Sequence, residues 1–279
     1  MRKLWLAGLV AVLIAGAVVW VVAGRGADRP DLPADSVSPP GTRLPDGFSV
    51  PDGALLLGPV LLRGTQGDPA AGWTAVLAVE GKPLDAWKRL AGRIAERYPG
   101  SGVDASAAPG CRAPAGTGLV CELSAYSKAS PATMLLQASL SQPADDVTGR
   151  YLIVLSASRL DLPPGMMPPT SESPAWRGGE APAPRPARRA PEVGEPLAPS
   201  SVAYPSDDRR YVVLEGSELL AQWGEGSLTG GFDVLLRTTG IATAEEVAEA
   251  YAEQATQYEG PAGVEQYRSG RTAFTRYLP

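Results

Sequence analysis

Twenty residues near the start of the chain, Leu4–Ala23, contain no charge, no proline and no strongly polar side chain. A helix of that length spans about 30 Å, which is the thickness of the hydrocarbon core of a bilayer. We therefore interpret residues 1–25 as a transmembrane anchor with a short cytoplasmic N-terminus. A cleaved secretory signal is the alternative, although the apolar core of a signal usually runs only about 7–15 residues. A buried soluble helix is the third interpretation, which the all-round apolar surface of a terminal segment disfavours.

Basic residues set the expected orientation of this segment. Arg2 and Lys3 precede it without a neighbouring acid, whereas basic and acidic residues alternate after it. Because basic residues resist translocation, the N-terminus is expected in the cytoplasm and the rest of the chain outside it. The product would be secreted if the segment is cleaved.

Charge and composition exclude several functions. The formal net charge of the 279 residues is −5, and residues 1–25 carry three basic residues and no acid, so the exported part carries −8. Nucleic acid demands a basic surface, so no such partner is expected. The absence of histidine removes Ser–His–Asp and Cys–His catalysis and the commonest metal ligand. No phosphate-binding glycine loop occurs, and we expect no cofactor and no metal. The 21 arginines beside 4 lysines resemble the coding bias of a GC-rich bacterial genome.

Cys111 and Cys121 are the two cysteines of the chain. Two thiols cannot build a four-ligand zinc site, and a redox pair normally has two intervening residues, whereas nine separate these. In an exported chain a pair this close is typical of a disulfide, and closing the loop is worth about 2–3 kcal/mol in the chain-entropy model. We therefore expect one structural bridge, formed in an oxidising compartment.

Proline divides the remaining chain. Residues 26–47 are Pro-rich and poor in apolar side chains, so we expect a semi-extended tether that holds the folded part away from the lipid. Residues 162–200 contain eleven prolines and form a second expected linker. Trp176, one of its few large apolar residues, either docks on a folded surface or is incidental, and we favour the second interpretation. These segments leave a first folded module at residues 48–161 and a second at residues 201–279.

Hydrophobic periodicity predicts one helix in each module. Pro83–Tyr98 has apolar residues at spacings of three and four, and its charged side is interpreted as a solvated face. In the second module, Thr243 and Glu246 form a capping box at the start of a helix. Patterned stretches around both helices predict strands at Ala54–Arg63, Trp73–Glu80, Val103–Ala107, Leu119–Tyr126, Thr133–Ser141, Arg150–Ser158, Tyr211–Glu215, Leu219–Gly224, Phe232–Thr239, Val264–Arg268 and Thr272–Leu278.

The two modules also resemble each other. Gly72 and Gly81 of the first are matched by Gly231 and Gly240 of the second, and the offset between matched positions stays at 159 to 161 residues. We interpret them as copies of a strand–strand–helix–strand–strand unit, the first with an added hairpin at Thr133–Ser158, against the alternative of chance likeness. The predicted fold class is therefore α+β: a single N-terminal transmembrane helix followed by two small antiparallel-sheet-plus-helix (ββαββ-like) modules joined by a Pro-rich linker.

Paired carboxylates are the one catalytic route that this composition leaves open. Asp145 with Asp146, and Asp207 with Asp208, are adjacent pairs in expected loops. Glycosidase acids must flank a bond from several Å apart, and calcium needs a looped series of ligands. We interpret both pairs as solvated loop charge and assign no catalytic residue.

The leading functional hypothesis is a membrane-anchored, non-enzymatic binding protein of the bacterial envelope. It would contact membrane lipid through its N-terminal helix and bind a protein or an envelope polymer. A carboxylate-only envelope hydrolase is one alternative. A lipid or small-ligand carrier is the other, and it would need a large apolar pocket lined by Trp73 and Trp87.

Overall fold

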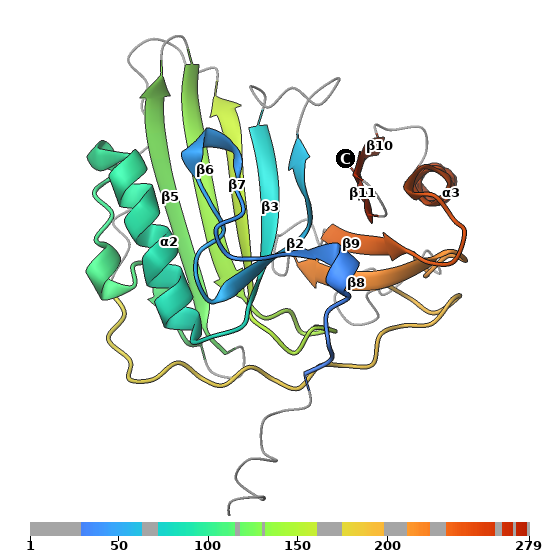
Figure 1. The fold of residues 1–279 in the computed structure, drawn as a ribbon, viewed down its shortest axis with the longest axis horizontal. Coiled ribbons are helices and arrows are strands. Elements are labelled where there is room, and N and C mark those ends of the chain that lie inside the picture. The colour runs from blue at the N-terminus through green and yellow to red at the C-terminus, as the bar shows by residue number, and fades with distance from the viewer. Residues whose placement is uncertain are drawn as a thin grey trace, which may run out of the picture.

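The computed structural model describes residues 29–62, 72–114, 118–129, 132–160, 175–197, 211–223, 233–259, 264–269 and 272–277. These residues form two antiparallel sheets and two α-helices, so the predicted α+β class is confirmed (Figure 1). No helix in this part of the chain is long and apolar enough to cross a bilayer. The anchor predicted at Leu4–Ala23 lies outside the described residues.

The first sheet consists of seven strands: β1 (Val37–Ser38), β2 (Ala54–Leu62), β3 (Gly72–Val79), β4 (Cys111–Arg112), β5 (Val120–Ala129), β6 (Ala132–Ser141) and β7 (Leu152–Leu160). Their order is β1-β2-β3-β7-β6-β5-β4, and every neighbouring pair is antiparallel. The pairing of β2 with β3 shifts register between Leu57 and Leu61. Pro59 lies at this break because proline has no N–H to donate to the ladder.

Helix α2 (Pro83–Arg97) covers one face of this sheet, as its apolar spacing predicts. Trp87, Leu90 and Ile94 are fully buried and pack with the alternate residues of the strands that point to the same side. The indole N–H of Trp87 donates to the carbonyl oxygen of Pro109 at 2.8 Å. The indole nitrogen of the buried Trp87 therefore has a hydrogen-bond partner, as a buried polar atom requires.

The residues expected to form a free tether belong to the folded body from Arg29 onward. Leu44 and Phe48 pack into the core beneath α2, while Leu32 and Val37 pack on the other side of the sheet. Proline keeps this segment irregular but does not prevent packing, because each of its sparse apolar side chains meets a core that the sheet provides.

The outward side of α2 is not only a solvated face. Arg89 donates to the carbonyl oxygen of Asp52 at 2.6 Å, and Arg97 donates to that of Asp46 at 3.0 Å. The carbonyls of Asp46 and Asp52 lie outside the strands and, within the described residues, accept no hydrogen bond from a neighbouring strand, so the arginines supply the donors. The charged face therefore holds that segment against the helix, a role that the spacing of charges does not reveal.

The second sheet consists of β8 (Ser217–Trp223), β9 (Asp233–Thr238), β10 (Val264–Ser269) and β11 (Thr272–Tyr277), in the order β10-β11-β9-β8. Helix α3 (Ala244–Glu259) packs on it through Val247 and Tyr251. The capping box is confirmed, since Thr243 N–H donates to the Glu246 carboxylate at 2.8 Å and Glu246 N–H donates to Thr243 Oγ1 at 3.2 Å. The terminal hairpin is confirmed by the pairing of β10 with β11.

Both sheets have the same connectivity. In each, two antiparallel strands lead into a helix, and the last strand that follows the helix returns beside the second strand: β7 beside β3, and β11 beside β9. The additional strands of the first sheet are β5 and the short β4 at its outer edge. They are not the predicted hairpin Thr133–Ser158, because its second strand, β7, lies beside β3 as β11 lies beside β9. A common origin of the two units stays a prediction.

The two sheets pack against each other, with the helices outside. Val76 and Leu152 of the first sheet share one core with Leu220 and Leu235 of the second. The neighbouring residue Leu219 points the other way and packs beneath α3. Because successive side chains of β8 point to opposite sides, this strand contributes both to the core between the sheets and to the core beneath α3. Figure 1 shows α2 and α3 at opposite sides of the molecule with the strands between them.

Residues 175–197, which we call the strap, run along one end of the molecule from the first sheet to the second (Figure 1, gold). Trp176 packs against the core beneath α2, and its backbone N–H donates to the carbonyl of Ala107 at 2.8 Å. At the other end, Leu197 is buried and its N–H donates to the carbonyl of Tyr211 at 2.9 Å. The interpretation of Trp176 as incidental is therefore wrong.

Two expected strands take another form. Ala105–Ala107 is a 3-10 helix, because the side chain of Asp104 accepts hydrogen bonds from the N–H and hydroxyl of Ser106 at 3.0 and 2.7 Å. Residues 211–215 make only isolated bridges to the strap, between Val213 and Val193 and between Val212 and Pro196. Their partner is distant in sequence, so local patterning could not identify it.

Candidate functional site

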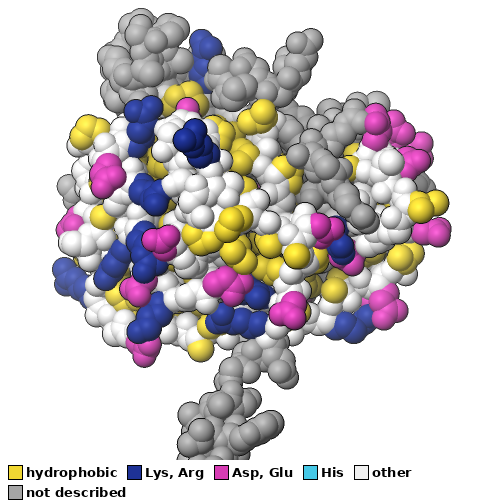
Figure 2. Space-filling model, in the orientation of Figure 1, with side chains coloured by type: hydrophobic (Ala, Val, Ile, Leu, Met, Phe, Trp, Pro, Cys, Tyr) yellow, Lys and Arg dark blue, Asp and Glu magenta, His cyan; other side chains and the backbone are white. Residues whose placement is uncertain are grey.

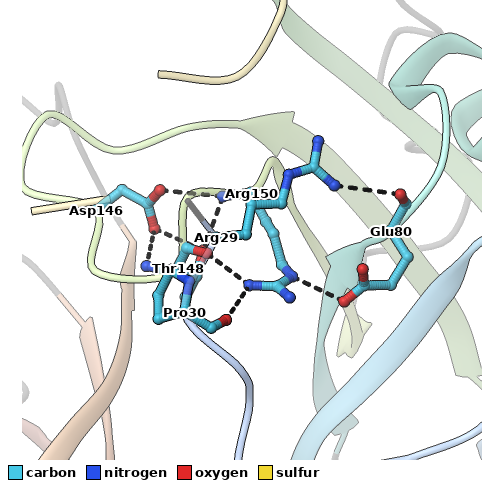
Figure 3. Close-up of polar contacts among 6 residues, drawn as sticks. All are labelled: Arg29, Pro30, Glu80, Asp146, Thr148 and Arg150. Atoms are coloured by element: carbon cyan, nitrogen blue, oxygen red, sulfur yellow. Dashed lines mark hydrogen bonds and ion pairs between the residues drawn. The ribbon is translucent and has the colours of Figure 1, made fainter. Parts of the chain in front are cut away.

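Asp146, one of the carboxylates singled out from the sequence, lies in the loop between β6 and β7 and is only 4% exposed. It accepts hydrogen bonds from the N–H and hydroxyl of Thr148 at 2.8 and 2.7 Å and from the N–H of Arg150 at 3.2 Å (Figure 3). Gln142 Nε2 donates a further hydrogen bond to it at 2.7 Å. A carboxylate can leave water only when such donors replace its hydration. The interpretation of this residue as solvated loop charge is therefore wrong.

Arg150 connects this loop to two other segments. Its Nε forms an ion pair with Glu80 Oε1 at 2.7 Å, and its Nη1 donates to the carbonyl oxygens of Thr148 at 2.6 Å and Pro30 at 2.9 Å. Arg29 in turn donates to the carbonyl of Glu80 at 3.3 Å. We call the six residues of Figure 3 the junction: Arg29, Pro30, Glu80, Asp146, Thr148 and Arg150. The junction fixes the start of the folded body to the ends of β3 and β7.

Asp145 points to a different partner from its neighbour. Its buried side chain forms an ion pair with Arg188 of the strap, and the N–H of Arg188 donates to the carbonyl of Asp146 at 2.8 Å. Arg185 adds a hydrogen bond from its N–H to Gln142 Oε1 at 2.6 Å. The loop between β6 and β7 is thus bonded to the strap as well as to the junction.

The acids proposed as a pair are therefore not aimed at a common point. Asp145 and Asp146 serve separate structural partners, and Asp207 and Asp208 lie outside the described residues. Within the ranges that the structure describes, no three His, Cys, Asp or Glu side chains are grouped as a metal site requires. The arrangement is suited to rigid attachment of one segment to another.

The disulfide predicted between Cys111 and Cys121 is present, with an S–S distance of 2.02 Å. The two residues lie directly opposite each other on β4 and β5, and both are buried in the core beneath α2. The bridge closes the outer edge of the first sheet, where β4 is only two residues long.

A second polar surface lies on the first sheet, on the side away from α2. We call it the open face and define it by exposed and half-buried residues of β5, β6 and β7: Glu122, Ser124, Gln137, Ser139 and Ser156. Strand register places Ser124, Gln137 and Ser156 in one row across three strands, and Glu122 opposite Ser139 in the next. The alternate residues point into the core beneath α2.

The second sheet covers only part of this side. Its core takes up Leu57, Val76 and Leu152 of β2, β3 and the start of β7. Half-buried Tyr126 and Leu135, opposite each other on β5 and β6, lie on the same side outside that core. The β5–β6 half carries hydroxyl and amide groups at strand and pleat spacings of about 5 and 7 Å. Apart from the Glu122 carboxylate, which only accepts and is paired with Arg112, the open face is a regular array of groups that both donate and accept hydrogen bonds.

Sequence reasoning identified the strands of the open face but not the face itself. The signal was the alternation in Thr133–Ser141, where Gln137 and Ser139 alternate with Leu136, Ala138 and Leu140. Period-two alternation indicates a sheet with one solvated side. Which part of that side stays uncovered depends on the second sheet, and the strands alone do not reveal it.

Comparison with protein-family models, with curated proteins and with solved structures gives no match to this chain.

Proposed function

We propose that this chain is a membrane-anchored, extracytoplasmic binding protein of the bacterial envelope, without catalytic activity, that binds a neutral glycan polymer on the open face. The observation that carries the binding role is the row formed by Ser124, Gln137 and Ser156 across three adjacent strands. Rigid, regularly spaced side chains need little ordering on binding, which favours affinity for a regular ligand.

The chemistry of the open face favours a glycan over a protein. Serine hydroxyls and the amide of Gln137 each donate and accept, which suits a ligand whose own groups are hydroxyls. The cores of protein–protein interfaces are instead enriched in aromatic residues and depleted in serine. The exported part carries −8, which disfavours an anionic polymer by charge repulsion.

Two observations support the envelope as location. The apolar segment Leu4–Ala23 has the length and flanking charges of a span that exports the chain on its C-terminal side. The disulfide between Cys111 and Cys121 is of the kind that persists in oxidising compartments.

The two alternative functions receive less support. A carrier would need a pocket beside Trp73 and Trp87, but both side chains are 0% exposed within the core beneath α2. The indole N–H of Trp73 is bonded to Asp46 Oδ2 at 2.7 Å, as a fixed structural residue would be. A carboxylate hydrolase would need free acids, whereas Asp145 and Asp146 are engaged by neighbouring groups.

Fractionation tests the location. The full-length chain should stay with membranes after a carbonate wash, and deletion of residues 1–25 should release it. Recovery of the full-length chain in the soluble cytoplasmic fraction would contradict the proposal.

Co-sedimentation with isolated envelope glycans tests the binding role. The full-length chain in nanodiscs should bind a neutral glycan, and Gln137→Leu should weaken binding by about tenfold, which is the value of roughly one or two net hydrogen bonds. Lys88→Leu, on the exposed side of α2, is the matched control and should bind like the parent. Equal binding by the two variants, or capture of protein without glycan, would overturn the assignment of the open face.

A further inference from the structure

We propose that the junction end of the body faces the membrane and lies within about 15 Å of its surface, with the strap between the body and the lipid headgroups. This inference rests on the anchored topology proposed above and specifies which surface meets the bilayer. It is the reverse of the arrangement expected from a free tether at residues 26–47.

The length of chain between anchor and body sets the distance. Five residues, 24–28, separate the end of the apolar segment from Arg29, where the described body begins. The steps from Ala23 to Arg29 span at most about 20 Å when fully extended. The headgroup layer itself takes up about 5–8 Å of that length. The body therefore starts within about 15 Å of the headgroup surface even if every linking residue is extended.

The first described residues of the body are held to it by several contacts. Arg29 and Pro30 are bonded to Glu80 and to the buried Arg150, respectively. Leu32 follows within the core between the two sheets. Because the attachment is made by both polar and apolar contacts, the body cannot extend its reach by unrolling this segment without losing them.

The position of Arg29 identifies the part of the body surface that faces the membrane. It includes the strap, the loop between β6 and β7, and the residues that join β3 to α2. Figure 1 shows the first described residues, in blue, at this end of the body beside the strap. The long strands run away from this end, and β5, with ten residues, extends about 33 Å. The strands of the open face therefore run away from the membrane, and the open face reaches only the envelope layer next to the membrane.

Charge does not add a preference for anionic lipid. The strap carries four arginines and three glutamates, and Arg189 is paired with Glu192 and Glu195 while Arg188 is paired with Asp145. Figure 2 shows basic and acidic side chains interspersed along this end. Proximity to the bilayer is thus set by chain length, and it should be equal on zwitterionic and anionic membranes.

Energy transfer to labelled lipid headgroups tests this arrangement. A single dye is attached at Ala190→Cys in the strap or at Glu96→Cys near the far end of α2, both at the surface, with the native disulfide intact. Glu96 lies about 20 Å along the helix from its membrane-proximal start. The full-length chain in vesicles should show strong transfer from position 190 and weaker transfer from position 96, with either lipid composition.

A lengthened linker provides the second arm. Forty Gly/Ser residues inserted between Gly26 and Ala27 form a coil that spans about 35 Å, and they should abolish most of the transfer from position 190. Equal transfer from the two positions, or transfer that the insertion leaves unchanged, would overturn the inference while leaving the anchor intact. A full-length chain lost from membranes in a carbonate wash would instead overturn the anchored topology itself.

Discussion

Arg150 and Glu80 are 70 residues apart in the chain, yet their Nε and Oε1 atoms lie 2.7 Å apart, with the arginine side chain only 7% exposed. The same guanidinium also donates to the carbonyl of Pro30. These contacts connect the first described residues of the body to the central strands, so the start of the body is fixed to the first sheet.

Replacement of this arginine should destabilise the fold. Arg150→Leu leaves Glu80 and the carbonyl of Pro30 without their donor, and we expect a loss of about 2–4 kcal/mol in the free energy of unfolding, measured by urea titration. Arg189→Leu, which breaks two ion pairs in contact with solvent, is the control and should leave the midpoint nearly unchanged. Equal effects of the two substitutions would show that burial of Arg150 does not matter.

A methyl group at Gly110 should disrupt the edge of the first sheet. Gly110 has φ of +70°, and a Cβ there would collide with the carbonyl oxygen of Glu122 on β5. We expect Gly110→Ala to cost well over about 1 kcal/mol and to slow closure of the neighbouring disulfide, followed by alkylation of free thiols. At Gly81 the nearest atom to a Cβ is 3.8 Å away, so Gly81→Ala should fold and oxidise like the parent.

The N-terminus of α3 should respond to acid through Glu246. Hydrogen bonds from the N–H and then the hydroxyl of Thr243 lower the pKa of Glu246 below its usual value. A lowered pKa in the folded state adds stability above the pKa of the unfolded chain, and this stability is lost as pH falls through the folded value. Glu246→Gln should therefore be less stable than the parent at neutral pH, and the difference should shrink in acid.

Urea titrations at several pH values measure this difference. Glu249→Gln removes an exposed acid from the same helix without removing the cap, and it is the matched control. A difference between Glu246→Gln and the parent that stays constant from neutral to acid would contradict a role for the charged cap.

Tyr251 should make the second unit sensitive to alkali. Burial raises the pKa of Tyr251, although hydrogen bonds with Ser217 and from the N–H of Leu214 act in the other direction. The unfolded chain therefore ionises first, so stability is full below about pH 10 and falls as pH rises towards the folded pKa. Tyr251→Phe should cost about 1–3 kcal/mol at neutral pH, because Leu214 N–H loses an acceptor 3.0 Å away.

Unfolding followed from neutral to alkaline pH checks both parts of this expectation. The advantage of the parent over Tyr251→Phe should decrease above about pH 10, where the phenol of the unfolded chain ionises. An advantage that grows with pH would mean that the folded state stabilises the ionised phenol, contrary to its burial.

The features that local sequence predicted are those made by near neighbours. Helix α2 follows from the spacing of Trp87, Ala91 and Ile94, which places them on one side within three turns. The cap at Thr243 needs only a glutamate three residues later. The disulfide was predicted from the two cysteines of a chain that is expected to be exported. The number of residues between them argued against a redox pair.

The errors share one cause, which is that a polar or Pro-rich stretch was assigned to solvent when a distant partner existed. Asp146 is buried because the turn that it caps is covered by the strap, and Trp176 is half-buried because α2 and the first sheet leave it a place to pack. The open face was not predicted, because the sequence does not show which residues the second sheet covers. Its residues alternate with core residues, but only the position of the second sheet shows which of them remain uncovered.

The sequence by itself determined the helices, most strands, the bridge between Cys111 and Cys121 and the expectation of an apolar span. Tertiary structure decided that residues 29–53 and the strap are parts of the body, and that Asp145 and Asp146 hold segments together. The physical reason is that periodicity and capping depend on residues within about one helical turn of each other. Burial of an isolated charge or of a sparse apolar residue depends instead on partners that only the folded chain brings within reach.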